Sequence, residues 1–162
     1  MNIKLPISTK HGEFVAHYTE RGLAALDFPK NKNAGTNAET NIPVEVRRWH
    51  KMTSSALRET LEGRAAHELP PLDLRSGTEF QQQVWAVLRR IAPGQTKSYA
   101  EVAEAVGKPG AARAVGNACG SNPIPVLVPC HRVLAADRRI GGFSGGLDWK
   151  RKLLAREGVE CR

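Results

Sequence analysis

A cysteine and a histidine stand side by side near the C-terminal end of the chain, in the segment Val-Pro-Cys-His-Arg-Val at 128–133. A thiolate is a strong nucleophile, but it forms at neutral pH only where a base or a positive charge lies close to the sulfur. His131 could be that base for Cys130, and Arg132 adds a cation. The apolar residues before Cys130 predict a partly buried thiol, which without such partners is inert. The segment is therefore either a reactive thiol or an ordinary buried strand.

The geometry of an extended strand argues against direct help from His131, because neighbouring side chains of a strand point to opposite faces. His131 can assist Cys130 only where the backbone turns, or through a bridging water. A metal site built from Cys119, Cys130 and His131 is a third reading. The chain has 3 cysteines and no Cys-x-x-Cys pair, which argues against a cysteine-rich zinc site or a disulfide scaffold.

Helical patterns surround this segment and must position it. Thr78 is typical of a helix N-cap, and Ser98 with Glu101 forms a capping box. The Gly-Lys-Pro-Gly run at 107–110 ends one helix, and another begins at once. We expect helices over 77–91, 99–107, 111–120 and 149–158. Helix, short turn and helix is the outline of a helix-turn-helix, although many helical hairpins share it.

The helix over 111–120 is unusual because Arg113 is its only charge and small residues fill most of it. A helix that reads the major groove carries several long polar side chains, which are missing here. So smooth a helix could approach a narrow DNA minor groove, with one long side chain entering the base stack. The alternative is that the small residues permit tight packing inside the protein.

The first third of the chain predicts an antiparallel sheet. Alternating and β-rich segments indicate strands over 2–8, 12–19 and 22–28, followed by a polar loop over 29–41. Pro43 opens a predicted helix that runs to about residue 64. Prolines and a Ser-Gly pair in the linker over 64–77 suggest a boundary between an N-terminal domain, 1–75, and a C-terminal domain, 76–162.

Composition limits the class of protein. The chain has 162 residues, with 41% hydrophobic and 25% charged residues, which is normal for a globular protein. No apolar run approaches the roughly 18 residues of a membrane span, and the first residues lack the apolar core of a signal peptide, so we expect an intracellular, cytoplasmic protein. A net charge of +8 favours a polyanionic partner such as nucleic acid, although many soluble proteins are simply basic.

Taken together, the motifs resemble those of O6-alkylguanine-DNA alkyltransferases, the methylated-DNA–protein-cysteine methyltransferases. The Pro-Cys-His-Arg-Val run at 129–133 is similar to the active-site signature of that family. The order and spacing of the segments at 98–103, 111–118, 122–133 and 141–158 are also similar. The resemblance covers about half of the chain, residues 76–158, whereas the first 75 residues match only in layout. It implies an α/β (α+β) fold, with a ribonuclease-H-like N-terminal domain and a mainly helical C-terminal domain containing a winged helix-turn-helix.

The resemblance also implies catalytic roles. Cys130 would accept the alkyl group, His131 would act as its base through a water, and Glu157 would orient the histidine. Asn122 would hold the turn between the recognition helix and the active-site strand. Tyr99 would crowd the phosphate of the flipped nucleotide and could donate a proton to the departing guanine.

For the DNA contacts, the resemblance implies that Arg113 fills the gap left by the flipped base. The small residues of its helix would lie in the minor groove, and the expected DNA-binding set is Tyr99, Ala112, Arg113, Ala114 and Gly116. The base pocket would be lined by Val128, Phe143, Ser144 and Gly145. We carry over no metal, because the N-terminal strands and the following helix contain no evident zinc ligands.

The implied activity is stoichiometric DNA repair. The protein would flip O6-alkylguanine out of duplex DNA and move the alkyl group irreversibly to its own cysteine, and O4-alkylthymine is left open as a second substrate. No cofactor is expected, and a monomer in solution is expected. The alternatives are a non-catalytic helix-turn-helix regulator, a lesion-binding protein, or a thiol hydrolase with a Cys-His-Glu set. The regulator would leave the Cys-His segment unexplained, and the hydrolase would leave the helix pair and the positive charge unexplained.

Overall fold

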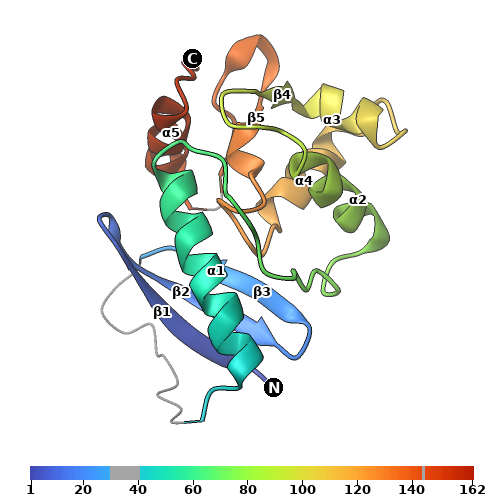
Figure 1. Cartoon of the computed structure of the whole chain (residues 1–162). Coiled ribbons are helices and arrows are strands. Elements are labelled where there is room, and N and C mark those ends of the chain that lie inside the picture. Colours follow the sequence, from blue (N-terminus) through green and yellow to red (C-terminus); the bar gives the residue numbers. More distant parts are fainter. Residues whose placement is uncertain (30–40, 144) are drawn as a thin grey trace.

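The computed structural model describes residues 1–29, 41–143 and 145–162. A three-stranded antiparallel sheet forms one end of the molecule, with β1 (Ile3–Thr9), β2 (Gly12–Thr19) and β3 (Gly22–Asp27) in the order β1-β2-β3. Helix α1 (Val44–Leu61) crosses this sheet, and the other helices gather at the opposite end (Figure 1). The chain is a mixed α/β protein, as predicted. The predicted loop over 29–41 falls almost entirely outside the described residues.

The sheet is buried on the side that its apolar residues occupy. Ile3, Leu5 and Ile7 of β1 are buried, and the residues between them are at least partly exposed, because alternate side chains of a strand point to opposite faces. Helix α1 contributes an apolar stripe at helical spacing. Its buried residues are Val46, Trp49, Thr53, Ala56, Leu57, Thr60 and Leu61.

Helix α2 (Glu79–Leu88) begins with the capping box that the sequence indicates, in which Thr78 and Gln81 bond each other's backbone. The helix ends at Leu88, so the expected extension to Ile91 is wrong. The amide of Ile91 bonds the carbonyl of Leu88 at 3.0 Å, a 3₁₀-type bond that tightens the last turn before Pro93.

The predicted helix pair is present as α3 (Tyr99–Ala105) and α4 (Ala112–Gly120). Ser98 and Glu101 form the expected capping box on α3. Gly107 and Gly110 both have positive φ, which favours glycine and lets the chain turn from one helix into the next. Helix α4 packs on α2, and the indole Nε1 of Trp85 donates to the carbonyl of Ala118 at 2.9 Å.

Two short strands bring the beginning of α3 next to the Cys-His segment. Strand β4 (Lys97–Ser98) pairs in parallel with β5 (Val133–Leu134), and the final helix α5 (Leu147–Arg156) packs behind them. Residues 130–132 form a 3₁₀ turn, so the expectation that Cys130 lies on a strand is wrong. Extended backbone begins only at Val133.

One contiguous apolar cluster joins the sheet to the helical end, from Ile3 to Leu153. Backbone bonds also link the two ends: the amide of Leu26 donates to Pro123 O at 2.9 Å, and the amide of Leu23 donates to Pro71 O at 2.8 Å. Part of the predicted linker is therefore bound along β3. The division into domains at residue 75 stays a prediction.

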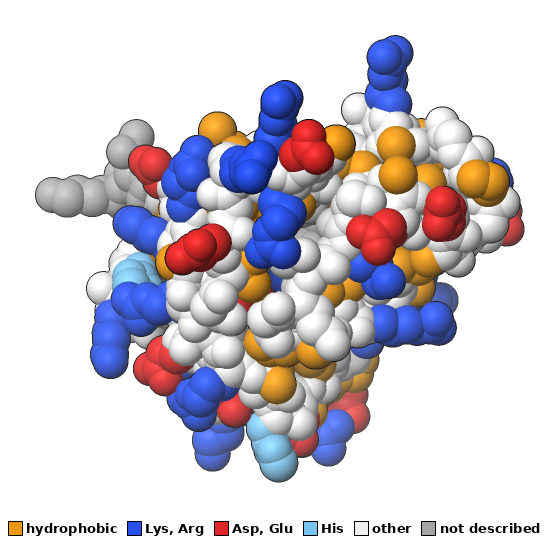
Figure 2. All heavy atoms as spheres, turned by 90° about the horizontal axis from the view of Figure 1, so that it is seen from above, with side chains coloured by type: hydrophobic (Ala, Val, Ile, Leu, Met, Phe, Trp, Pro, Cys, Tyr) orange, Lys and Arg blue, Asp and Glu red, His pale blue; other side chains and the backbone are white. Residues whose placement is uncertain are grey.

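The face of the molecule at the top of Figure 1 carries side chains of both charges. Figure 2 shows Lys and Arg side chains spread over this face with Asp and Glu among them, rather than gathered in one basic patch. Among the described residues, none of the helices has the length and apolarity that a membrane crossing requires.

Candidate active site

Cys130 lies at the bottom of a cavity of about 380 Å³ between α3, α4 and the segment before α5. Its side chain is almost fully buried, as the apolar residues before it predict. The cavity is lined by Tyr99, Gly116, Cys119, Gly120, Cys130, Gly142 and Phe143. A small chemical group can therefore approach the sulfur through this cavity, although Cys130 itself is only 3% exposed.

The loop that carries Cys130 is held by one amide side chain. Asn122 Nδ2 donates to the carbonyl of Val128 at 2.7 Å, and its Oδ1 accepts from the amide of Ile124 at 2.9 Å. Val126, between these two bonds, has φ of 75°, which is unusual for a β-branched residue and is maintained only where the surroundings fix the backbone. Asn122 thus lies where the sequence expects it, closing the turn before Cys130.

His131, Glu157 and Arg132 form a buried network beside the cysteine. His131 Nε2 lies 3.1 Å from Glu157 Oε2. Arg132 donates to both oxygens of the same carboxylate, at 2.9 and 2.8 Å, and its Nη1 donates to the carbonyl of Ile91 at 2.6 Å. The sequence suggests Arg132 as a cation for the thiol, but its guanidinium is bonded to Glu157.

The protonation states of this network follow from burial and pairing. Burial by itself would raise the pKa of Glu157, but the hydrogen bonds and charges of His131 and Arg132 lower it to about 2, so the carboxylate is ionised. Burial lowers the pKa of His131 below its usual value, which favours a neutral ring. An ionised carboxylate can only accept, so the Nε2 of His131 carries the proton. Its Nδ1 is then a bare acceptor, and it has no hydrogen-bond partner among the described residues.

Lys150 is a buried cation near the thiol that the sequence analysis missed. Its side chain is fully buried, and its Nζ donates to the carbonyls of Val133 at 2.7 Å and Gly142 at 3.0 Å. Burial raises the pKa of Cys130, while the hydrogen bond of Asn122 and the charge of Lys150 oppose that rise. One signal could have found it: Lys150 precedes the buried Leu153 and Leu154 by three and four residues, on the same helix face.

Cys119 is the second thiol of the cavity. Burial and the neighbouring Cys130 raise the pKa of Cys119 to about 12, opposed only by the charge of Lys150. Cys119 is therefore protonated at neutral pH and a poor nucleophile. Burial also raises the pKa of Cys130, but there the neighbouring Asn122 side chain opposes the rise in addition to Lys150.

Tyr99 and helix α4 form the mouth of the cavity. A Cβ on Gly116 would lie 3.9 Å from the ring of Tyr99, and a Cβ on Gly141 would lie 2.7 Å from its hydroxyl oxygen, so the ring sits between two glycines. Arg113 and Ala114 are exposed, and Ala112 is half-buried. Arg113 lies three residues before Gly116 and so shares with it the helix face that borders the cavity.

The expected base-pocket residues separate in the structure. Phe143 lines the cavity with Cys130. Gly145 instead lines a neighbouring hollow beside the end of β3. Val128 was expected to contribute backbone groups, and its carbonyl accepts from Asn122 Nδ2. The fourth expected residue, Ser144, lies outside the described residues.

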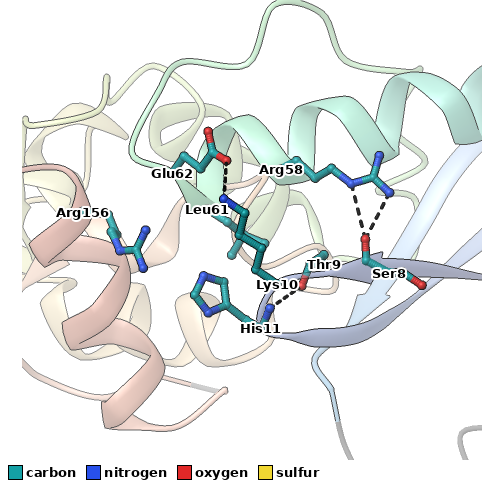
Figure 3. Close-up of a pocket in the computed structure, with 8 residues that line it drawn as sticks. All are labelled: Ser8, Thr9, Lys10, His11, Arg58, Leu61, Glu62 and Arg156. Atoms are coloured by element: carbon teal, nitrogen blue, oxygen red, sulfur yellow. Dashed lines mark hydrogen bonds and ion pairs between the residues drawn. The ribbon is translucent and has the colours of Figure 1, made fainter.

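A second hollow of about 420 Å³ lies between the β1–β2 turn, the end of α1 and α5. Three of its charged groups, Lys10, Arg58 and Glu62, have partners, and Figure 3 marks their contacts within the hollow with dashed lines. Lys10 Nζ is 3.9 Å from Glu62 Oε1, and Arg58 donates twice to the carbonyl of Ser8. No cysteine lines this hollow, and Glu62, its one carboxylate, is paired with Lys10 and Arg64, so the cavity of Cys130 is the better candidate for the chemistry.

Comparison with known proteins agrees with this placement. Residues 79–159 match the family model "6-O-methylguanine DNA methyltransferase, DNA binding domain". A methylated-DNA–protein-cysteine methyltransferase of Methanosarcina barkeri is 38% identical over 154 residues, which is 93% of this chain and 94% of that protein. One from Mycolicibacterium paratuberculosis is 58% identical over 86 residues, 53% of this chain, and the match spans only 52% of that relative.

Solved structures resemble the whole fold. A crystal structure of Mycobacterium tuberculosis OGT in complex with DNA has a TM-score of 0.76 at 37% identity, covering 94% of this chain and 90% of that one. The M. tuberculosis O6-methylguanine methyltransferase has a TM-score of 0.75 at 35% identity, covering 97% and 93%. With this fold, a buried Cys-His-Glu set and a sequence relative over 93% of its length, the chain belongs to the O6-alkylguanine-DNA alkyltransferase family, the methylated-DNA–protein-cysteine methyltransferases.

Proposed function

We propose that this protein repairs DNA by moving the alkyl group of O6-alkylguanine irreversibly to the sulfur of Cys130. Its family is named for methyl transfer from methylated DNA to a protein cysteine. The observation that carries the assignment of the acceptor is the placement of the buried Cys130 in the wall of a cavity, with the buried His131–Glu157 pair beside it. The protein acts once, because the thioether product is not hydrolysed by water.

The chemical step needs a thiolate and a base to take its proton. The neutral His131 offers Nδ1 as the acceptor, reached from Cys130 through a water, and Glu157 stabilises the imidazolium that forms. The sulfur then attacks the alkyl carbon in line, the S–C bond forms, and the C–O6 bond breaks with its electron pair passing to guanine. Tyr99, whose pKa is raised by burial, keeps its proton and can give it to the departing base.

The base must leave the duplex to reach the cavity. An alkylated guanine pairs poorly, so its extrusion costs less than that of a normal base. Helix α4 presents small exposed residues that fit a minor groove, and Arg113 on the same face can occupy the gap in the stack. Binding of a related structure to DNA supports this partner. A monomeric state and a cytoplasmic location stay predictions.

The decisive experiment is intact-mass spectrometry after mixing the protein with a duplex that carries one O6-methylguanine. We expect one added methyl group per protein, saturating at that ratio. Trypsin cuts after Arg113 and Arg132, so a single peptide over 114–132 carries both Cys119 and Cys130. The acceptor must therefore be assigned from fragment ions of that peptide.

Two serine variants complete this experiment. Cys130→Ser should bind the duplex and gain no methyl group, whereas Cys119→Ser should still be methylated at Cys130. An unmodified wild-type protein that binds the lesion would favour the lesion-binding or regulatory alternative. Repeated turnover by Cys130→Ser would exclude the mechanism.

A further inference from the structure

We infer that Phe28, which follows strand β3 in the N-terminal sheet, is a positioning residue that holds the Phe143 wall of the cavity at its correct distance from Cys130. Phe28 touches neither the sulfur nor the reacting base, and it acts through its contacts with Phe143 and Gly145. This inference rests on the proposed function, since it concerns the same cavity.

Phe28 is the centre of an aromatic cluster that spans the two ends of the molecule, with Phe14 buried and Phe143 and Trp149 partly buried. Its ring centroid lies 5.1 Å from Trp149 of α5, 5.5 Å from Phe14 of β2, and 5.7 Å from Phe143. The contact with Phe143 is edge-to-face, with 78° between the planes, a geometry that aromatic pairs favour. Only 8% of Phe28 is exposed, so its ring has little freedom to move away.

Gly145 shows how closely the cavity segment approaches this ring. A Cβ built on Gly145 would lie 2.5 Å from Cε2 of Phe28 and 2.7 Å from its Cζ, distances that real Cβ atoms do not show. Gly145 is not among the glycines with positive φ, so its backbone angle gives no reason for glycine there. The close contact with Phe28 gives that reason.

Phe143 links Phe28 to the site, because it contacts Phe28 and also lines the cavity. Its side chain lines the cavity that holds Cys130, and its ring meets His131 edge-on at 6.4 Å. Two residues before Phe28, the amide of Leu26 bonds the carbonyl of Pro123, next to Asn122. A shift of the sheet or of Phe28 would therefore move the cavity wall together with the loop that carries the nucleophile.

The DNA-binding face should be insensitive to this contact. Helix α4 is held by α2 and α3, through contacts such as the bond from Trp85 to Ala118, and none of its residues packs on Phe28 in the aromatic cluster. Loss of Phe28 should therefore slow the chemical step, because small displacements of reacting groups are costly in rate. The affinity of the protein for DNA should stay unchanged.

The first test compares Phe28→Leu with Tyr18→Leu under single-turnover conditions, with protein in excess over a duplex containing O6-methylguanine. Tyr18 is another buried aromatic residue, on β2, but its ring packs on His50. We expect Phe28→Leu to lower the saturating transfer rate about 10-fold, for the duplex and for the free O6-alkylguanine base alike. Its affinity for undamaged duplex should stay within about 2-fold of wild type, and Tyr18→Leu should transfer at the wild-type rate.

A double-mutant cycle tests the contact itself. Gly145→Ala should also slow transfer, because its new methyl group meets the ring of Phe28. Leucine at position 28 lacks the Cε2 and Cζ atoms of that clash, so the protein with both substitutions should react faster than Gly145→Ala alone. Purely additive losses would show that the two residues do not act through each other.

The outcomes separate this inference from the proposed function. If the wild-type protein transfers methyl groups to Cys130 and Phe28→Leu does so at the same rate, only the role of Phe28 is overturned. If the wild-type protein transfers none, the proposed function fails first. Should Phe28→Leu not fold, a wild-type rate for Gly145→Ala overturns the inference by itself.

Discussion

The Nε2 of His131 lies 3.1 Å from Oε2 of Glu157, and both side chains are fully shielded from solvent. Arg132 holds the other side of the same carboxylate. This arrangement fixes the tautomer of the histidine, so that its second ring nitrogen is free to accept a proton. Four predictions follow from this site and its surroundings.

The buried carboxylate makes stability depend on pH. The pKa of Glu157 is lowered from 4.5 to about 2 in the folded protein, so its ionised form stabilises the fold above pH 4.5, and that contribution is lost as the pH falls toward 2. The size expected is about 3 kcal/mol at full effect. Denaturant unfolding at pH 5 and pH 3 should therefore show a larger loss for wild type than for Glu157→Gln. Equal losses in the two proteins would contradict the prediction.

The pH profile of transfer should identify the base. Because burial lowers the pKa of His131, the ring is neutral throughout the neutral range, and the single-turnover rate should be flat from about pH 7 to 8.5. The rate should fall only below the usual histidine pKa of about 6.5. A rate that rises about tenfold for each pH unit would indicate a thiolate formed by hydroxide instead. His131→Gln should remove the flat region.

Lys150→Met should make the thiol less reactive. The charge of Lys150 opposes the rise that burial causes in the pKa of Cys130, so its loss should raise that pKa further. We expect transfer to slow about 10-fold and the reaction of Cys130 with iodoacetamide to shift to higher pH. Lys152→Met is the matched control, because Lys152 is exposed two residues away on α5. An unchanged iodoacetamide profile in Lys150→Met would exclude the electrostatic role.

Arg113→Ala should weaken both DNA binding and transfer. Arg113 is exposed on the face of α4 that borders the cavity, where it can replace the flipped base. We expect about a 10-fold loss of duplex affinity, with a smaller dependence of binding on salt concentration. Arg47→Ala removes an exposed arginine from α1 and should leave both properties near wild type. Equal effects of the two substitutions would point to non-specific charge.

Local signals in the sequence were sufficient for most elements of the fold. The capping boxes at Thr78 and Ser98 depend on residues three positions apart, so they mark the beginnings of α2 and α3 without tertiary information. The alternation in β1 likewise identifies its buried face. The end of α2 was misplaced because Ile91 is buried through packing although it follows the helix.

The sequence by itself also singled out Cys130 and His131, because a nucleophile and a base that are adjacent in the chain can be recognised without a structure. It could not decide whether the two cooperate, since that depends on the backbone. The 3₁₀ turn at 130–132 and the bonds of Asn122 that fix the preceding loop are products of packing between distant segments.

Only the tertiary structure decided which charges act on the site. Arg132 is adjacent to the nucleophile in sequence but is bonded to Glu157, whereas Lys150, twenty residues away, is buried close enough to act on the thiol. The ring of Phe28 reaches the cavity wall from the opposite end of the chain. Burial and electrostatic pairing depend on distance in space, and packing between segments far apart in the sequence sets those distances.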